Sequence, residues 1–403
     1  MIFIKKTKIL QLLLLILVLS SCKQNNKEGI LTDDEVAKDT LPHMEPSKEK
    51  FPKLTAQYIN SKKNAIEHFY NKNWPNNSMN GSFLVAKNGQ IIFEKYEGMA
   101  NFRDKRPMTA TTPLHLASVS KVLTASAILK LIDAKKISLD QKVNSIITNF
   151  PFADITVKML LNHRSGMRNY AYFTDKKDGV WDRHNRLSNK DIVELMATKN
   201  IGVESRADSR FSYCNTNYAI LALIIEKTTG LSYKKAMERM IFKPLGMNHT
   251  YVFDYEKDKD TAVTSYKGNK VEIGKDYLDA IYGDKNIYST PRDLLKFDLA
   301  RNAPGFLSPK LLKLVYTPFS NERKGERNYG LGIRMINWES GQNFYFHNGW
   351  WHGNTSSYVT LQKEHVTIIA LSNKFTTKTY QIRKLSPLFG DYPFKLGKDE
   401  KEE

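Results

Sequence analysis

Cysteine is almost absent from this sequence, with only Cys22 and Cys214 among 403 residues. If Cys22 is modified, as argued below, Cys214 has no partner and no disulfide can form within the chain. Stability must then come from packing. Apolar residues make up 41% of the chain and aromatic residues 11%, which is enough for a hydrophobic core in one large domain or two ordinary ones.

Two common hydrolase signatures are also missing. The nine histidines are spread along the chain without an H-E-x-x-H motif, which argues against a metallohydrolase. No G-x-S-x-G motif occurs, which argues against the nucleophile turn of an α/β-hydrolase. We therefore expect neither a metal nor an organic cofactor.

A long apolar run is lacking too. Residues 9–19 are apolar but fall short of the ~20 residues that a membrane-spanning helix needs. Lysines precede this run, so it is typical of a signal peptide rather than of an uncleaved anchor. It ends in Leu19-Ser20-Ser21-Cys22, which resembles a bacterial lipobox, with Cys22 as the lipidated residue.

A lipid on Cys22 would hold the protein to a membrane surface, since each buried methylene contributes about 0.8 kcal/mol. Lys23 follows the cysteine where an Asp would resemble a signal for retention at the inner membrane. We therefore expect a lipid-anchored protein of the cell envelope, at the outer membrane rather than the inner one.

The formal net charge is +19, which favours contact with lipid head groups or carboxylated wall polymer. The basic residues are scattered among acidic ones and form no aromatic and basic platform. We therefore expect no nucleic-acid partner, and a generally basic surface explains the charge equally well.

The order of predicted elements indicates an α+β fold. Strands are expected at 82–86 and 91–96, joined by Asn88-Gly89, and again near the C-terminus, while the pattern between them is mostly helical. This order predicts an antiparallel sheet that closes from distant parts of the sequence, is flanked by helices and carries an inserted helical lobe. The predicted helices are 58–71, 157–163, 218–229 and 376–385, the late strands are 330–336, 343–347, 356–361 and 366–372, and a capping box begins at Thr290. The predicted parts are a signal peptide (1–22), a flexible tether (23–55), one domain (56–388, helical lobe about 133–280) and a charged tail (389–403).

The first candidate for catalysis is the S-x-x-K motif Ser118-Val119-Ser120-Lys121. Positions three apart share one face of a helix, so the Lys121 ammonium can lie beside the Ser118 hydroxyl. The motif also occurs at Ser20, Ser47 and Ser232, but these positions belong to the lipobox, the tether and a helix cap. Ser118 instead opens an apolar helix, although a capping role is an equally good reading of the motif alone.

Two further motifs supply groups that acyl transfer needs. In Tyr213-Cys214-Asn215 a phenol hydrogen-bonded to an ammonium can act as a base, and Asn215 can orient a carbonyl. In His347-Asn348-Gly349 the glycine lets a substrate approach the backbone, and the N–H of Trp350 could join that of Ser118 in an oxyanion hole.

These three motifs, in this order and context, resemble those of penicillin-recognising serine enzymes, nearest to the class C β-lactamases with related D,D-peptidases and esterases. The resemblance covers roughly residues 56–388 and includes the segments 160–167, 244–247 and 287–294. It implies a β-lactamase/transpeptidase-like fold. It also implies that Ser118 is the nucleophile, Lys121 its proton-transfer partner and Tyr213 the general base, while Asn215, His347, Gly349 and Trp350 bind substrate.

One position departs from the β-lactamase pattern, which usually has Lys where His347 stands. A neutral histidine is a poorer partner for a substrate carboxylate, so the departure shifts weight from β-lactam hydrolysis to peptide or ester hydrolysis. The expected substrate is a β-lactam, a D-amino-acid peptide or a carboxylic ester. The alternative is a non-catalytic lipoprotein that binds cell-wall peptides.

Overall fold

The computed structural model describes residues 41–175, 177, 179–322 and 325–395. The predicted signal peptide, the lipidation of Cys22 and the last eight residues of the tail lie outside this part of the chain. Among the described residues, no helix is both long enough and apolar enough to cross a membrane.

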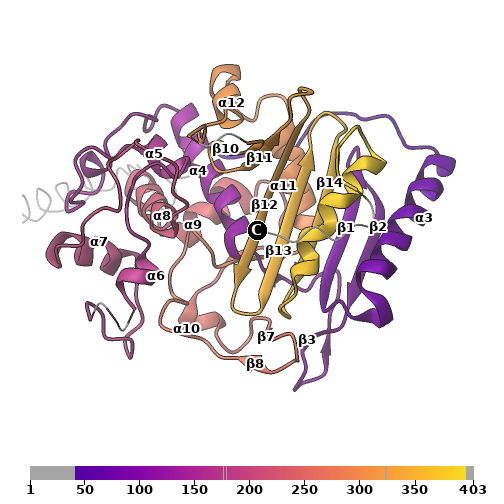
Figure 1. Cartoon of the computed structure of the whole chain (residues 1–403), viewed down its shortest axis with the longest axis horizontal. Coiled ribbons are helices and arrows are strands. Elements are labelled where there is room, and N and C mark those ends of the chain that lie inside the picture. The colour runs from indigo at the N-terminus through magenta and orange to yellow at the C-terminus, as the bar shows by residue number, and fades with distance from the viewer. Residues whose placement is uncertain (1–40, 176, 178, 323–324, 396–403) are drawn as a thin grey trace, which may run out of the picture. The chain divides into compact units, whose positions relative to one another are not determined.

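A seven-stranded antiparallel sheet forms the centre of the domain (Figure 1). The strand that comes first in the sequence pairs with the strand that comes last, since Gly81 lies opposite Ser372. The predicted closure between distant parts of the chain is therefore confirmed. The strands, in spatial order, are β10 (Arg327–Tyr329), β11 (Arg334–Asn337), β12 (Asn343–Trp351), β13 (Asn354–Leu361), β14 (Val366–Ser372), β1 (Gly81–Lys87) and β2 (Gln90–Glu97).

The β1–β2 hairpin follows the sequence prediction. Asn88 and Gly89 both have positive φ angles, 54° and 72°, which is the backbone geometry that a tight hairpin turn requires. β13 and β14 are buried along their whole length, because helices cover both faces of the sheet at this point.

Helices cover both faces of the sheet, and the first and last of the described helices lie on the same face. The N-terminal helix α3 (Ala56–Asn73) packs on β2, and the late helical segment η5 (Thr377–Leu388) packs on β13 and β14 beside it (Figure 1). On the other side, α11 (Pro291–Asn302) packs on β1 and β14, and the short turn η2 (Ala117–Val119) packs on β12 and β13.

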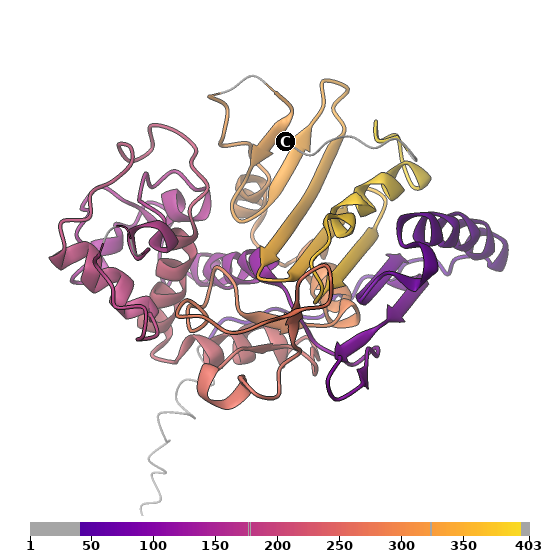
Figure 2. The same ribbon diagram turned by 60° about the horizontal axis from the view of Figure 1, so that its bottom comes forward.

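The helices within residues 120–258 form the lobe inserted between β2 and the late strands, whereas a short helical turn at 75–77 precedes β1 and the helix at 309–315 follows α11. Figure 2 shows these magenta segments gathered at the left, apart from the yellow and orange strands. α8 is almost entirely buried and packs against α4, α5, α7 and α9. The helical elements are η1 (Pro75–Asn77), α4 (Ser120–Asp133), η3 (Val143–Ser145), α5 (Val157–Leu161), α6 (Tyr170–Phe173), α7 (Asn189–Thr198), α8 (Asn215–Thr229), α9 (Tyr233–Met237), η4 (Glu238–Phe242), α10 (Tyr255–Asp258) and α12 (Pro309–Val315).

Three small antiparallel sheets complete the domain. One of them joins β5 to β9 and so connects the residues before Ser118 to the segment before α11. Their strands are β3 (Met99–Asn101) with β4 (Arg106–Pro107), β5 (Leu114–His115) with β9 (Ile287–Ser289) and β6 (Tyr251–Val252), and β7 (Ser265–Tyr266) with β8 (Glu272–Ile273).

Some predicted boundaries are wrong. The strand expected at 330–336 is instead a turn followed by β11, because Gly332 adopts φ 85° and so leaves the extended conformation. The capping box at α11 is half formed: Thr290 accepts from the Asp293 N–H, but the Asp293 carboxylate accepts from the His249 N–H instead. The strand expected at 343–347 continues to Trp351, so the H-x-G motif lies within β12.

Residues 41–55 carry no helix or strand but lie against the domain. Met44 is 1% exposed and its N–H donates to the Met240 carbonyl at 2.8 Å. The Phe51 ring contacts the His365 ring with centroids 4.6 Å apart. The described part of the predicted tether is therefore packed on the domain.

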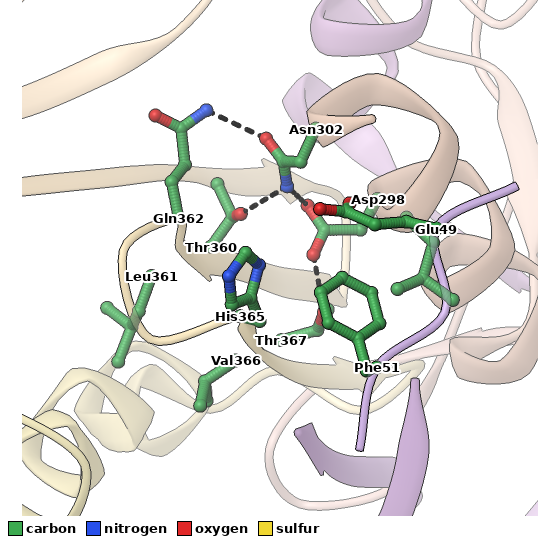
Figure 3. A pocket seen from close by; sticks show the side chains of 11 residues that line it. Glu49, Phe51, Asp298, Asn302, Thr360, Leu361, Gln362, His365, Val366 and Thr367 are labelled. Carbon is green, nitrogen blue, oxygen red and sulfur yellow. Dashed lines mark hydrogen bonds between the residues drawn. The ribbon is translucent and has the colours of Figure 1, made fainter. Parts of the chain in front are cut away.

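A buried carboxylate joins α11 to the sheet. Asp298 accepts hydrogen bonds from Asn302 at 2.9 Å and from Thr367, as Figure 3 shows, and a third from Tyr358. The neighbouring cavity, of about 20 Å³, has room for about one water molecule and contains none of the three sequence motifs. The hydrogen bonds of Asp298 therefore hold α11 against β13 and β14.

Three histidines lie in the interior. His115, His163 and His347 are at most 2% exposed. Burial is the main cause that lowers the pKa of each, to about 3 for His115 and well below the usual range for His163 and His347. All three are therefore neutral at physiological pH.

We expect acid to destabilise the fold through these histidines. Their folded pKa values lie below the unfolded value of about 6.5, so their contribution to stability is full above that pH and is lost as the pH falls. The expected slope is up to about 1.4 kcal/mol per pH unit for each histidine. Urea denaturation between pH 7 and pH 5 measures it, and a free energy of unfolding that stays constant over this range would contradict the prediction.

A core substitution remote from the motifs should affect stability alone. Ile66 is fully buried where α3 packs on the sheet. We expect Ile66→Ala to lower the free energy of unfolding by roughly 3 kcal/mol, because it leaves a cavity. Denaturant titration measures this loss. A change of less than about 1 kcal/mol would show that the site collapses around the smaller side chain.

Candidate active site

Ser118 lies in the η2 turn, and α4 begins two residues later. The helix therefore starts slightly later than the sequence analysis placed it. The relation between the two motif residues is nevertheless the expected one, since Lys121 Nζ donates a hydrogen bond to Ser118 Oγ at 3.0 Å.

The Lys121 ammonium is buried without a carboxylate partner among the described residues. Its second hydrogen bond goes to the main-chain carbonyl of Asp284 at 2.8 Å. The rings of Tyr213 and Tyr218 lie 5.2 and 5.7 Å away, measured to their centroids. The charge is therefore stabilised by a carbonyl dipole and two aromatic faces, which leaves the ammonium directed at the serine.

The main chain before Ser118 is fixed by several hydrogen bonds. The Leu116 N–H donates to the Ile287 carbonyl at 2.8 Å, and the Leu116 carbonyl accepts from Ser356 Oγ at 2.6 Å. Ala117 has φ 46°, a left-handed conformation that is rare for a residue with a side chain. Such a conformation persists only when its surroundings impose it, and here it sets the direction of the nucleophile.

Gly349 brings β12 into contact with the nucleophile. A Cβ atom at this position would lie 2.8 Å from the Ser118 nitrogen, 2.6 Å from the Leu116 oxygen and 2.4 Å from Ser356 Oγ. No other residue fits at this distance. The first and third motifs are thus joined through their main chains, which places the next residue, Trp350, at the same edge. The Trp350 side chain is 61% exposed.

The second motif lies at the start of α8, next to Lys121. Asn215 is the first residue of the helix, and Tyr213 precedes it. The Tyr213 hydroxyl and Asn215 Oδ1 are buried and make no hydrogen bond with the described residues. The sequence analysis supposed a hydrogen bond from Lys121 to the phenol, whereas the structure places the ammonium over the Tyr213 ring.

His347 lies in the interior of the site. Its Nε2 is 3.2 Å from the Tyr329 hydroxyl, and its Nδ1 is 2.8 Å from the Asn348 carbonyl. Both ring nitrogens are therefore engaged within the protein. Its predicted contact with substrate, like the predicted roles of the other motif residues, stays a prediction.

Two residues outside the motifs complete the site. The Arg334 guanidinium on β11 lies 4.6 Å from the centroid of Tyr213 and makes no hydrogen bond or ion pair with the described residues. The His163 ring packs on the Tyr213 ring with centroids 4.3 Å apart, and its Nδ1 accepts from the Cys214 N–H at 3.2 Å. The sequence signal for His163 was its place in the similar segment 160–167, while nothing marked Arg334.

A possible set of metal ligands lies near the third motif. Asp276, Asp279 and His352 offer ligand atoms within 4.8 Å of one another. However, Asp279 already accepts hydrogen bonds from the Trp351 indole at 2.7 Å, from His352 Nε2 at 3.1 Å and from the Asp276 N–H at 2.6 Å. These donors lower the pKa of Asp279 to about 2 although burial opposes them. The carboxylate is thus saturated by N–H donors, which suits an anchor better than a metal ligand.

Solved structures with the same architecture include a penicillin-binding protein from Bacillus halodurans, with a TM-score of 0.69 and 23% identity over 80% of this chain and 98% of the other. FmtA from Staphylococcus aureus gives a TM-score of 0.67 with 23% identity, over 87% of this chain and 95% of the other. At this identity the likeness shows the fold.

Similar sequences carry related names. Penicillin-binding protein 4* of Bacillus subtilis (strain 168) is 29% identical over 320 residues, which are 75% of this chain and 70% of that protein. The teichoic acid D-alanine hydrolase of Staphylococcus aureus (strain NCTC 8325 / PS 47) is 27% identical over 256 residues, 62% of each chain. The family model described as Beta-lactamase matches residues 77–385, which include all three motifs. With its fold, its serine–lysine pair and this match over most of its length, the chain belongs to the β-lactamase family of serine hydrolases and penicillin-binding proteins.

Proposed function

We propose that this chain is an active serine hydrolase that cleaves an amide or ester through an acyl-enzyme on Ser118. The observation that carries the proposal is the 3.0 Å hydrogen bond from the buried Lys121 ammonium to Ser118 Oγ. A lysine that capped or packed for stability alone would not need to bury its charge against a serine hydroxyl.

The chemistry follows from the groups around Ser118. Its oxygen attacks the substrate carbonyl carbon, and its proton passes to the Tyr213 oxygen, which accepts it as a phenolate that the Lys121 ammonium stabilises. The same proton then goes to the leaving amine or alcohol, which departs as the Ser118 ester forms. Water hydrolyses this ester and restores the serine.

The developing oxyanion needs hydrogen-bond donors placed before the reaction. The N–H groups of Ser118 and Trp350 are suited to this role, because Gly349 brings their main chains together. The Tyr213 hydroxyl and Asn215 Oδ1, which make no hydrogen bond with the described residues, can serve the proton and the substrate.

The charges around the site favour a substrate with an anionic group. Arg334 and Lys121 both lie against the Tyr213 ring, while His163 and His347 are neutral. The guanidinium of Arg334 makes no hydrogen bond with the described residues, and its N–H donors suit a carboxylate or phosphate. The names of the relatives, a penicillin-binding protein and a teichoic acid D-alanine hydrolase, agree with a D-amino-acid amide or ester that carries such a group.

The nucleophile can be tested by intact-protein mass spectrometry after incubation with a penicillin and, separately, with a p-nitrophenyl ester. We expect an acyl adduct that Ser118→Ala abolishes, because the only attacking oxygen is removed. Ser120→Ala is the matched control, since that hydroxyl accepts the Ile287 N–H and should leave the adduct intact.

An adduct that persists in Ser118→Ala would refute the assignment. If neither reagent forms an adduct with the unaltered protein, the proposal fails for these substrates and the non-catalytic binding protein becomes the better description.

The role of Arg334 can be tested with two esters that differ only in a carboxylate or its neutral amide near the scissile bond. A hydrogen bond to a charged group contributes about 1.5–3 kcal/mol, so Arg334→Gln should lower kcat/KM for the carboxylate roughly 10- to 100-fold. The loss for the neutral ester should be much smaller, and Arg334→Lys should recover part of the preference. Equal losses for the two esters would show that Arg334 supports Tyr213 rather than recognising an anion.

A further inference from the structure

A buried polar network connects the two main-chain segments that would supply the oxyanion donors. It consists of His115, Asn286 and Asp279, which are 2%, 2% and 3% exposed. None of the three belongs to a sequence motif. His115 lies on β5, whereas Asp279 and Asn286 both lie in the loop between β8 and β9, so two separate parts of the chain contribute.

One end of the network contacts the residue before the nucleophile. His115 Nδ1 accepts the Ala117 N–H at 3.0 Å, and this fixes the ring in the tautomer that carries hydrogen on Nε2. Nε2 therefore donates to Asn286 Oδ1 at 2.8 Å. Since Ala117 is the residue with φ 46°, His115 supplies a contact that maintains the left-handed conformation directly before Ser118.

Asn286 links this end to the other. Its amide nitrogen donates to the carbonyls of Asp279 and Ile281, both at 2.7 Å. Asn286 itself has φ 68°, which an asparagine tolerates better than most residues. The side chain is saturated by these three partners, so its position follows from theirs.

The other end contacts the residues after the third motif. The Asp279 carboxylate accepts from the Trp351 indole and from His352 Nε2. These two residues follow Trp350 directly, where β12 ends. Asp279 therefore fixes the main chain just beyond the N–H group of Trp350.

We propose that His115, Asn286 and Asp279 are positioning residues that hold the Ser118 and Trp350 N–H groups in the geometry of an oxyanion hole. This inference rests on the proposed function for its catalytic consequence. Its structural content, that the two donors depend on one network, stands apart from turnover and can be measured separately.

Asn286→Gly tests the link between the two ends. Glycine keeps the left-handed backbone but removes the bridging amide. Loss of one oxyanion donor lowers kcat by about 10²- to 10³-fold, so partial misplacement of both should lower kcat roughly 10- to 100-fold with little change in KM. Ile66→Ala is the control for lost stability, and it should leave kcat unchanged at temperatures where the protein is folded.

His115 offers a matched pair of variants. Asparagine can place its oxygen near the position of Nδ1 and so accept the Ala117 N–H, whereas glutamine reaches the position of Nε2 and leaves that N–H without its acceptor. Both substitutions replace the imidazole ring by an amide, and we expect them to lower the melting temperature by similar amounts. We expect His115→Gln to lose at least tenfold more in kcat than His115→Asn. Equal losses would reduce His115 to a packing residue and overturn its part in the proposal.

A measurement without turnover separates this inference from the proposed function. The protein has five tryptophans, so ¹⁵N-tryptophan labelling gives a simple spectrum of backbone and indole signals. We expect Asp279→Ala and Asn286→Gly each to shift the Trp350 amide and the Trp351 indole signals, and Ile66→Ala to shift neither. Unchanged Trp350 and Trp351 signals would overturn the network even in an active enzyme. The expected shifts in a protein that a serine-directed phosphonate fails to label would support the network and refute the proposed function.

Discussion

The ammonium of Lys121 is the constraint on which the rest of the site depends. A buried cation without a carboxylate partner is costly, and here it is compensated by Ser118 Oγ, the Asp284 carbonyl and two tyrosine faces. Each of these partners comes from a different part of the fold, so the helical lobe, the segment before β9 and the nucleophile turn must meet at one point. Burial lowers the pKa of His163 and His347, the charges of Lys121 and Arg334 lower it further, and both rings stay neutral. Burial and these two cations therefore set the electrostatics of the site.

Main-chain contacts between the sheet and the nucleophile turn also fix the position of Ser118. Gly349 excludes any side chain between β12 and the nucleophile turn, and Ser356 on the neighbouring strand bonds the Leu116 carbonyl. The turn is thus built onto the sheet rather than onto its own helix. This explains why Ala117 can hold a left-handed conformation, since strain in one residue is small beside the contacts that surround it. A nucleophile fixed in this way loses little entropy when it attacks.

Local patterns in the sequence predicted the architecture well, because most elements here are specified by their own residues. The Asn88-Gly89 hairpin and the apolar strands β13 and β14 follow from neighbouring residues in the sequence. The wrong boundaries have tertiary causes. Gly332 ends a strand pattern because it lies against Ala125 of α4, a contact that no local pattern contains. The helix α4 begins later than predicted for a tertiary reason too, because the preceding turn packs on the sheet.

The same distinction between local and tertiary causes applies to the candidate site. Motif spacing predicted the Ser118–Lys121 contact, because positions three apart on a helical turn are neighbours whatever surrounds them. Arg334 and the His115–Asn286–Asp279 network gave no signal, because their roles depend on contacts between residues far apart in the sequence, such as His115 with Asn286 and Asp279 with Trp351. No sequence motif marks residues of this kind, and only their contacts in the folded structure give them a role. They also set what the motifs leave open, namely which substrate binds and how well its oxyanion is held. A family with a common serine–lysine pair can therefore diverge in function through such supporting residues while its motifs stay the same.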